Sequence, residues 1–143
     1  MTAISNEENE SFRKSVPEFM MKTPYLSTFP LEITKYENDD IELRLKFREN
    51  FTNDGTVYHG GVIATVVDTA GALAAWSNHD FNKGAKASTV SIALQYIAAA
   101  KKSDLIVKAF AKKRGKELIF VEIDAYDENS NLVAHALQTY RIA

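Results

Sequence analysis

One carboxylate stands alone in the most apolar stretch of the chain. Between Gly60 and Trp76 the only charged residue is Asp68. A buried carboxylate without partners is costly, so Asp68 must lie in a pocket with polar neighbours. It could serve there as a general base or as a nucleophile. The alternative is a structural acid that accepts hydrogen bonds from loop amides or pairs across a subunit interface.

Two glycines precede this acid at the start of the same stretch. Gly60 and Gly61 have no side chains to block access. Their backbone N–H groups could bind an oxyanion at the positive end of a helix dipole. A glycine-rich turn that only permits close packing is the alternative.

The stretch that carries these residues has the pattern of a buried helix over residues 60–77. At 100° per residue, its large apolar side chains fall on one broad face, and small residues share the other face with Asp68. A helix that is apolar or small on nearly all sides needs cover on most of them, so we expect curved β-structure to wrap it. The large set is Val62, Ile63, Val66, Val67 and Leu73, and the small set is Gly60, Gly61, Ala64, Gly71, Ala72 and Ala75.

The rest of the chain supplies the strands for this cover. Alternating apolar residues and intervening turn formers predict strands at 31–36, 41–47, 88–97, 105–112, 118–127 and 132–142. Residues 1–24 are predicted to form an N-terminal helical segment, which starts at a capping box of Ser5 and Glu8 and is divided by Pro17. No repeat or shift in composition marks a boundary, so residues 1–143 are predicted to form a single domain.

Composition argues against several classes of protein. A net charge of −2 gives no basic field for nucleic acid. There is no cysteine, and His59, His79 and His135 lack the spacing of metal ligands, so we expect neither a metal nor another cofactor. The acidic start lacks the features of a secretory signal, and Asp68 interrupts the one long apolar stretch. We therefore expect a cytoplasmic protein with no membrane partner.

The spacing of Asn53, the triplet His59-Gly60-Gly61 and Asp68, within NDGTVYHGGVIATVVDTAGALAA, resembles the PaaI-type (phenylacetate-degradation) branch of the hotdog thioesterases. The likeness continues through STVSIALQYIAAAK and GKELIFVEIDAYDENSNLVAHALQTYRI and covers roughly residues 30–142. It implies an α+β hotdog fold, in which a curved antiparallel β-sheet wraps a long central helix. It also implies a homodimer or homotetramer with active sites between subunits.

The resemblance further implies a role for each matching residue. Asp68 would be the general base or nucleophile, and the Gly60 N–H would polarise the carbonyl of an acyl-coenzyme A thioester, with Gly61 beside it. Asn53 and His59 would position substrate or water, from the subunit opposite Asp68. Thr89 matches a hydroxyl position that orients water, for which Ser88 and Ser91 compete.

Five basic residues are candidates for binding the coenzyme A phosphates, because such anions favour exposed cations. Solvated surface charge is the alternative. Two rival functions also stand beside thioester hydrolysis. One is a hotdog dehydratase or hydratase, although its proline-rich approach to the central helix is missing, and the other is a non-catalytic acyl-CoA or lipid binder. The five basic residues are Lys101, Lys102, Lys112, Lys113 and Arg114.

Overall fold

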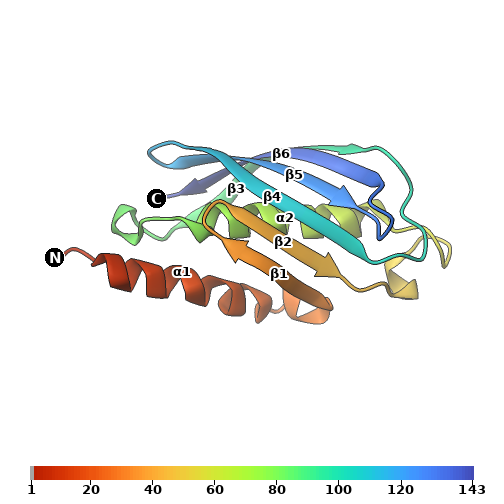
Figure 1. The fold of residues 1–143 in the computed structure, drawn as a ribbon, viewed down its shortest axis with the longest axis horizontal. Helices are drawn as coiled ribbons and strands as arrows, with labels where there is room; N and C mark the ends of the chain where they lie inside the picture. The colour runs from red at the N-terminus through yellow and green to blue at the C-terminus, as the bar shows by residue number, and fades with distance from the viewer. Residues whose placement is uncertain (1) are drawn as a thin grey trace.

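A computed structural model describes residues 2–143, in which an antiparallel six-stranded sheet curves around one long helix (Figure 1). The strand order is β1-β2-β4-β5-β6-β3. The strands are β1 (Leu31–Glu37), β2 (Asp40–Leu45), β3 (Ala87–Tyr96), β4 (Leu105–Arg114), β5 (Leu118–Tyr126) and β6 (Leu132–Ile142). The helices are α1 (Asn6–Met21) and α2 (Gly60–Ser77), with short 3-10 helices η1 (Leu26–Thr28), η2 (Glu49–Phe51) and η3 (Phe81–Lys83). The predicted hotdog fold is confirmed.

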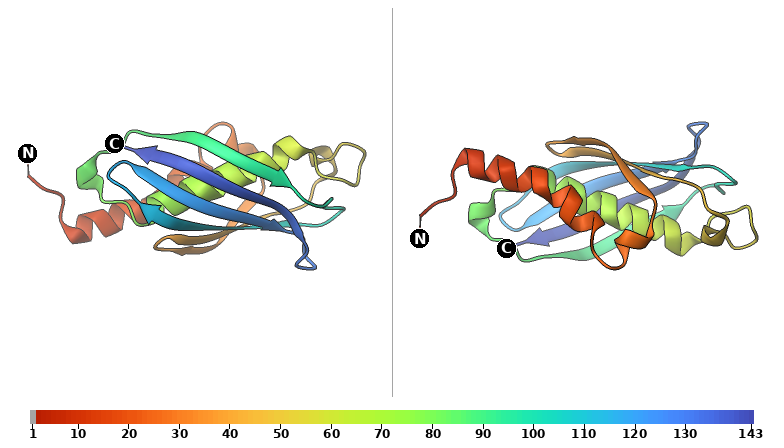
Figure 2. Two further views of the ribbon diagram at one scale, coloured as in Figure 1. Left: turned by 90° about the horizontal axis from the view of Figure 1, so that it is seen from above. Right: turned by 90° about the horizontal axis from the view of Figure 1, so that it is seen from below.

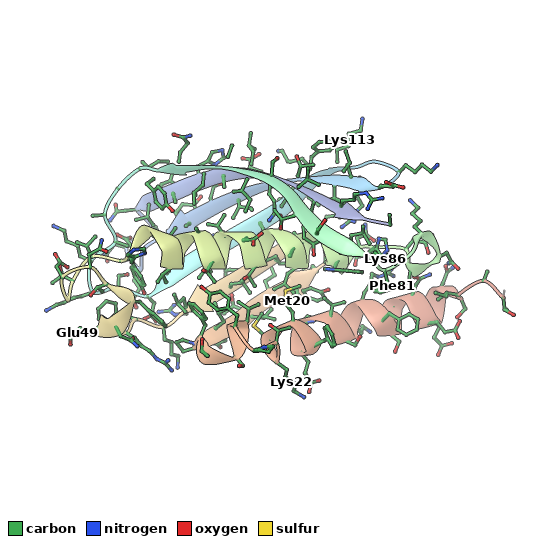
Figure 3. All side chains as sticks on the ribbon, turned by 180° about the vertical axis from the view of Figure 1, so that it is seen from behind. Met20, Lys22, Glu49, Phe81, Lys86 and Lys113 are labelled. Atoms are coloured by element: carbon green, nitrogen blue, oxygen red, sulfur yellow. The ribbon has the colours of Figure 1, made fainter. Side chains whose placement is uncertain are left out.

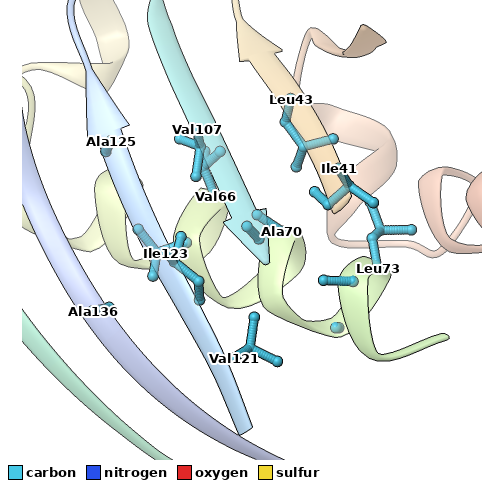
Figure 4. Close-up of a cluster of buried hydrophobic side chains, with 14 of the residues drawn as sticks. Ile41, Leu43, Val66, Ala70, Leu73, Val107, Val121, Ile123, Ala125 and Ala136 are labelled. Atoms are coloured by element: carbon cyan, nitrogen blue, oxygen red, sulfur yellow. The ribbon is translucent and has the colours of Figure 1, made fainter. Parts of the chain in front are cut away.

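Helix α2 packs its large apolar side chains against the concave face of the sheet (Figure 4). Val66 and Leu73 are completely buried, and each central strand contributes every second residue to the same core. The predicted buried face of the helix is therefore correct, except that Val62 is only half-buried. The strand residues labelled in Figure 4 are Ile41, Leu43, Val107, Val121, Ile123, Ala125 and Ala136.

Within residues 2–143, α2 is the one helix long and apolar enough to cross a membrane. Its apolar window is 61% buried inside the fold. The apolar character of α2 is thus explained by its place at the centre of the sheet.

Helix α1 runs continuously past Pro17, so the predicted division of this segment is wrong. A proline lacks the N–H that would bond the carbonyl four residues earlier, here that of Arg13. The hydroxyl of Tyr36, on β1, donates to that Arg13 carbonyl at 2.9 Å. A side chain from the sheet thereby replaces the lost helical hydrogen bond. The predicted capping box of Ser5 and Glu8 is confirmed.

Helix α1 packs against α2 on the side away from the sheet (Figure 2). Two polar contacts fix its first half to the segment after α2. The Asn9 side-chain oxygen accepts from the Phe81 N–H at 2.7 Å, and Arg13 donates to the His79 carbonyl at 3.1 Å. The central helix is therefore enclosed between the sheet and α1.

The two outer strands of the sheet differ in character. β1 carries Glu32, Lys35 and Glu37, and its register with β2 shifts between Ile33 and Lys35. β3 has no charged residue over its ten residues and is mostly exposed. The chemistry of the two edges is thus unlike.

Candidate active site

Asp68 lies half-buried on the side of α2 that faces β3 and β6. Its Oδ1 accepts from the Thr89 hydroxyl at 2.7 Å and from the Gln138 side-chain amide at 2.8 Å. Within residues 2–143, Oδ2 accepts no hydrogen bond, and Asp68 forms no ion pair. One carboxylate oxygen is therefore held in place, while the other is available to a proton or to a carbonyl carbon.

Gln138 is a site residue that the sequence analysis missed. It is 2% exposed, and its amide nitrogen also lies 3.2 Å from the Asp68 carbonyl. The side chain passes directly over Gly71, where an added Cβ would lie 2.0 Å from Gln138 Oε1. The small face of α2 thus admits a side chain that orients the acid. A polar residue at an inward position of β6, between Ala136 and Tyr140, was the available signal.

Thr89 reaches Asp68 from the first half of β3, where it lies opposite Tyr140 of β6. Neither Ser88 nor Ser91 is hydrogen-bonded to the carboxylate. Among the three hydroxyl residues that the sequence left open, Thr89 is the one that contacts the acid.

The start of α2 leaves one backbone donor free. His59 is the N-cap, and its Nδ1 accepts from the Gly61 N–H at 2.8 Å, which engages that N–H within the chain. The Gly60 N–H has no acceptor among residues 2–143. The Tyr96 hydroxyl, a second contact missed from sequence, donates to the Gly60 carbonyl at 2.7 Å. Of the two predicted donors, only that of Gly60 remains open to a ligand.

A tight loop holds Asn53 and His59 beside the start of α2, and both residues are exposed. Asp54 Oδ1 accepts from the Val57 and Thr56 N–H groups, each at 2.9 Å. These backbone hydrogen bonds hold the pKa of the Asp54 carboxyl below its ordinary value. The Asn53 N–H closes the loop onto the Val57 carbonyl at 2.9 Å. The loop geometry is thus set by the Asp54 side chain and by one backbone hydrogen bond, and the side chains of Asn53 and His59 lie at its surface.

The predicted site residues form two separate groups in one chain. Asp68 follows Gly60 by eight residues of one helix, which corresponds to about 12 Å along the axis. Asp68 and Thr89, with Gln138 beside them, make the first group, and Gly60 with its neighbouring loop makes the second. A single thioester cannot contact both groups of the same chain.

The basic residues do not form one cluster. Lys101 and Lys102 lie exposed beside the loop that carries Asn53, where Lys101 bridges to Val57. Lys112 and Lys113 lie at the other end of β4, roughly 30 Å away at about 3.3 Å per residue. One coenzyme A phosphate group cannot reach both ends.

Arg114, for which phosphate binding was predicted, makes its hydrogen bonds within the chain. Its guanidinium donates to the Ala74 and Ala75 carbonyls at 2.9 and 2.8 Å, and to Asp39 at 2.6 Å. These acceptors include carbonyls of the last turn of α2, which a helix leaves unpaired. Arg114 therefore caps α2, and its contact with coenzyme A stays a prediction.

One group of metal-ligand types occurs within residues 2–143, away from Asp68. Donor atoms of Glu122, Asp124 and His135 lie within 4.8 Å of one another on β5 and β6. His135 Nδ1 is 2.6 Å from Asp124, and Lys112 lies 3.4 Å from Glu122. Each carboxylate thus already has a side-chain partner within the chain, and these contacts account for the cluster.

The family model of the thioesterase superfamily matches residues 55–134, which is more than half of the chain. This range includes Gly60, Asp68 and Thr89. The chain belongs to the thioesterase superfamily. Thioester hydrolysis is therefore its class of activity, and the family resemblance drawn from the sequence is confirmed.

Two relatives show how far the similarity extends. A Saccharolobus solfataricus protein provisionally assigned as an esterase is 31% identical over 125 residues, which cover 87% of this chain and 81% of that protein. Acyl-coenzyme A thioesterase 13 of Homo sapiens is 30% identical over 97 residues, covering 66% of this chain and 67% of the human protein.

Solved structures share the architecture at lower identity. The Escherichia coli PaaI protein from the phenylacetic acid degradation operon has a TM-score of 0.81 at 15% identity, with 94% of this chain and 96% of that chain covered. A hypothetical thioesterase of Streptococcus pneumoniae, crystallised with coenzyme A, has a TM-score of 0.77 at 21% identity, with 90% and 96% covered. These likenesses establish the common fold.

Proposed function

We propose that this protein hydrolyses acyl-coenzyme A to a free acid and coenzyme A, with Asp68 as the catalytic carboxylate. The observation that carries the proposal is that the two carboxylate oxygens of Asp68 have different surroundings. Thr89 and Gln138 both bond Oδ1, so Oδ2 is directed and unoccupied. A structural acid would be expected to use both oxygens. The human relative named an acyl-coenzyme A thioesterase supports the choice of substrate class.

The site requires two copies of the chain. An oxyanion donor and a base must both lie about 3 Å from the reacting groups of one thioester. Gly60 and Asp68 of one helix are too far apart for this, so the donor for Asp68 comes from the partner subunit's Gly60. The partner's Asn53 and the partner's His59 would accompany it.

Strand β3 supplies the surface for this pairing. An exposed, uncharged edge strand is normally covered by another element, because its free N–H and C=O groups otherwise recruit strands at random. A second copy of β3, paired antiparallel about a two-fold axis, gives a closed dimer. We place the axis near Ile92, in the middle of the strand.

This pairing brings the two halves of the site together. Thr89, near the start of β3, is bonded to Asp68, whereas Tyr96, at its end, is bonded to Gly60. In an antiparallel pair the start of one strand lies beside the end of the other. Asp68 of one subunit then faces the partner subunit's Gly60, and two equivalent sites result.

In the proposed reaction, the thioester carbonyl oxygen accepts a hydrogen bond from the free Gly60 N–H. Asp68 Oδ2 either removes a proton from water as the water oxygen attacks the carbonyl carbon, or attacks that carbon itself to give a mixed anhydride that water then cleaves. In both routes the C–S bond breaks and coenzyme A leaves as its thiol. Such an oxyanion donor contributes about 3 to 4 kcal/mol, and a general base contributes roughly 10²- to 10⁴-fold.

A place for coenzyme A lies on the Gly60 side of the site. A cavity of about 370 Å³ is lined by Gly60, Ile63, Tyr96 and the segment 97–100. Lys101 and Lys102 follow that segment directly and are exposed. We assign the pantetheine arm to this cavity and the phosphates to these two lysines. A non-catalytic acyl-CoA binder would use the same surfaces, so only turnover separates the two functions.

Thiol release from a panel of acyl-coenzyme A substrates tests the proposal. Wild type should hydrolyse at least one, and Asp68→Asn should reduce kcat at least 100-fold while the chain remains folded. Asp124→Asn, a half-buried acid on β5 away from the site, is the matched control and should keep wild-type activity. Full activity in Asp68→Asn would refute the role of this carboxylate.

Mixed dimers test the shared site. Gly60 is the first residue of α2, a position where proline is well tolerated but has no N–H to donate. Gly60→Pro and Asp68→Asn should each be inactive alone. After the two variants are mixed and exchange subunits, about one quarter of wild-type activity should return, because half of the dimers are mixed and each has one intact site. No recovery despite exchange would contradict a site shared between subunits.

A further inference from the structure

A second, larger cavity lies between α1 and the end of α2. Its volume is about 530 Å³, within the range of small-molecule sites. Val16 and Met20 line it from α1, and Trp76, Phe81 and Tyr140 line it from the opposite side. Met20 and Phe81 are labelled in Figure 3. Most of its lining residues are apolar and none is charged, so the cavity suits an apolar group.

The cavity is preformed by rigid contacts. The rings of Trp76 and Phe81 are stacked with centroids 5.4 Å apart, and Phe81 packs on Phe12 at 5.2 Å. The bonds from Asn9 and Arg13 to the segment after α2 fix the distance between α1 and this aromatic wall. Phe19, at the rim, is 76% exposed, which is unusual for a large apolar side chain without a partner.

One wall of the cavity connects to the catalytic carboxylate. Tyr140 lies opposite Thr89 in the pairing of β6 with β3, and Thr89 donates to Asp68. Burial raises the pKa of the Tyr140 hydroxyl, and the negative charge of Asp68 acts in the same direction. Trp76 lies two helical turns beyond Asp68, about 12 Å along α2 and away from Gly60.

We propose that this cavity receives the acyl chain, and that the preferred substrate carries an unbranched alkyl group of medium length. This inference rests on the proposed thioesterase function. The thioester lies at Asp68, coenzyme A extends toward the partner subunit's Gly60, and the alkyl chain extends along α2 toward Trp76. The negative Asp68 at one end accepts a neutral thioester and repels the carboxylate product, which favours product release.

Chain-length dependence is the first test. Each methylene that enters an apolar site should raise kcat/KM about fourfold. We expect this rise from butanoyl- to octanoyl-coenzyme A in wild type. Val16→Phe, which fills the cavity from α1, should flatten this rise. Its kcat/KM for butanoyl-coenzyme A should stay within about twofold of the wild-type value. Ser11→Phe, exposed on the same helix and outside the cavity, is the matched control and should behave as wild type.

A binding measurement separates the cavity from catalysis. Trp76 is the only tryptophan of the chain, so its fluorescence reports directly on the cavity. The neutral alcohol 8-bromooctan-1-ol should quench Trp76 saturably in wild type and in Ser11→Phe, and at least fivefold more weakly in Val16→Phe. Normal turnover without quenching of Trp76, or without dependence on chain length, would show that the acyl chain does not bind in this cavity. Quenching without turnover of any acyl-coenzyme A would overturn the proposed function instead.

Discussion

Gly71→Ala isolates the contact between Gln138 and the Asp68 carboxylate. The new Cβ would lie 2.0 Å from Gln138 Oε1 and 2.5 Å from the carbon that bears it, so the Gln138 side chain must move. Its 2.8 Å hydrogen bond to Asp68 Oδ1 is then lost. A hydrogen bond to a charged group contributes about 1.5 to 3 kcal/mol. If that energy is expressed in the transition state, kcat/KM falls roughly 10- to 150-fold.

The effect on stability should be small in comparison. Alanine favours a helix over glycine by about 1 kcal/mol, whereas overpacking costs about 1 to 3 kcal/mol. These terms oppose each other, so the free energy of unfolding should fall by no more than about 2 kcal/mol. Thiol-release kinetics together with urea unfolding would show activity and stability responding separately.

The double variant provides the decisive control. Gln138→Ala removes the side chain with which the new Cβ collides, so adding Gly71→Ala should then leave kcat/KM unchanged and raise stability by about 1 kcal/mol. An equal loss of activity from Gly71→Ala in both backgrounds would show that the clash with Gln138 is not the cause. Unchanged activity of Gly71→Ala alone would show that Gln138 does not orient Asp68.

Three further variants test contacts outside the site. Tyr36→Phe leaves the Arg13 carbonyl without its donor, so Tm should fall by a few degrees in a thermal melt. An unchanged Tm would show that the Tyr36 hydroxyl does not replace the hydrogen bond that Pro17 cannot make. Arg114→Met should lower the free energy of unfolding, measured in urea, by about 2 kcal/mol and leave the KM for acyl-coenzyme A unaltered. A raised KM would instead support phosphate binding by Arg114. Burial lowers the pKa of His79, so the unfolded state binds a proton more readily than the folded state, and stability is lost as pH falls below about 6.5. His79→Gln should reduce that loss. An identical dependence of stability on pH in the variant and in wild type would contradict this role of His79.

The elements of the fold were predictable because each is specified by a local pattern. The apolar and small faces of α2 and the alternation in the strands gave the correct order and type of elements. Pro17 was misjudged because the donor that compensates it, Tyr36, comes from a distant strand. No local rule reveals a hydrogen bond formed across the tertiary structure.

The candidate site was predictable in part. The lone charge of Asp68 and the two adjacent glycines were visible in the sequence, and the family resemblance added Thr89. Gln138 was overlooked because a glutamine in a strand is usually exposed, and only the fold turns it inward over Gly71. The contacts of Arg114 with α2 were not foreseen, because in the sequence a basic residue at a strand end looks the same whether it faces solvent or the last turn of a helix.

The contrast between the two outer strands limits how many subunits can associate through the sheet. A sheet with two receptive edges can add copies without end, as cross-β fibrils do. Here β1 carries three charged side chains, whereas β3 carries none, and the register of each strand with its neighbour shifts once. Once β3 is paired with β3 of a second copy, the two outer strands of the joined sheet are both β1. In the proposed dimer, lengthening by strand addition would therefore stop at two chains, and the shared site would form without polymerisation through the sheet edges.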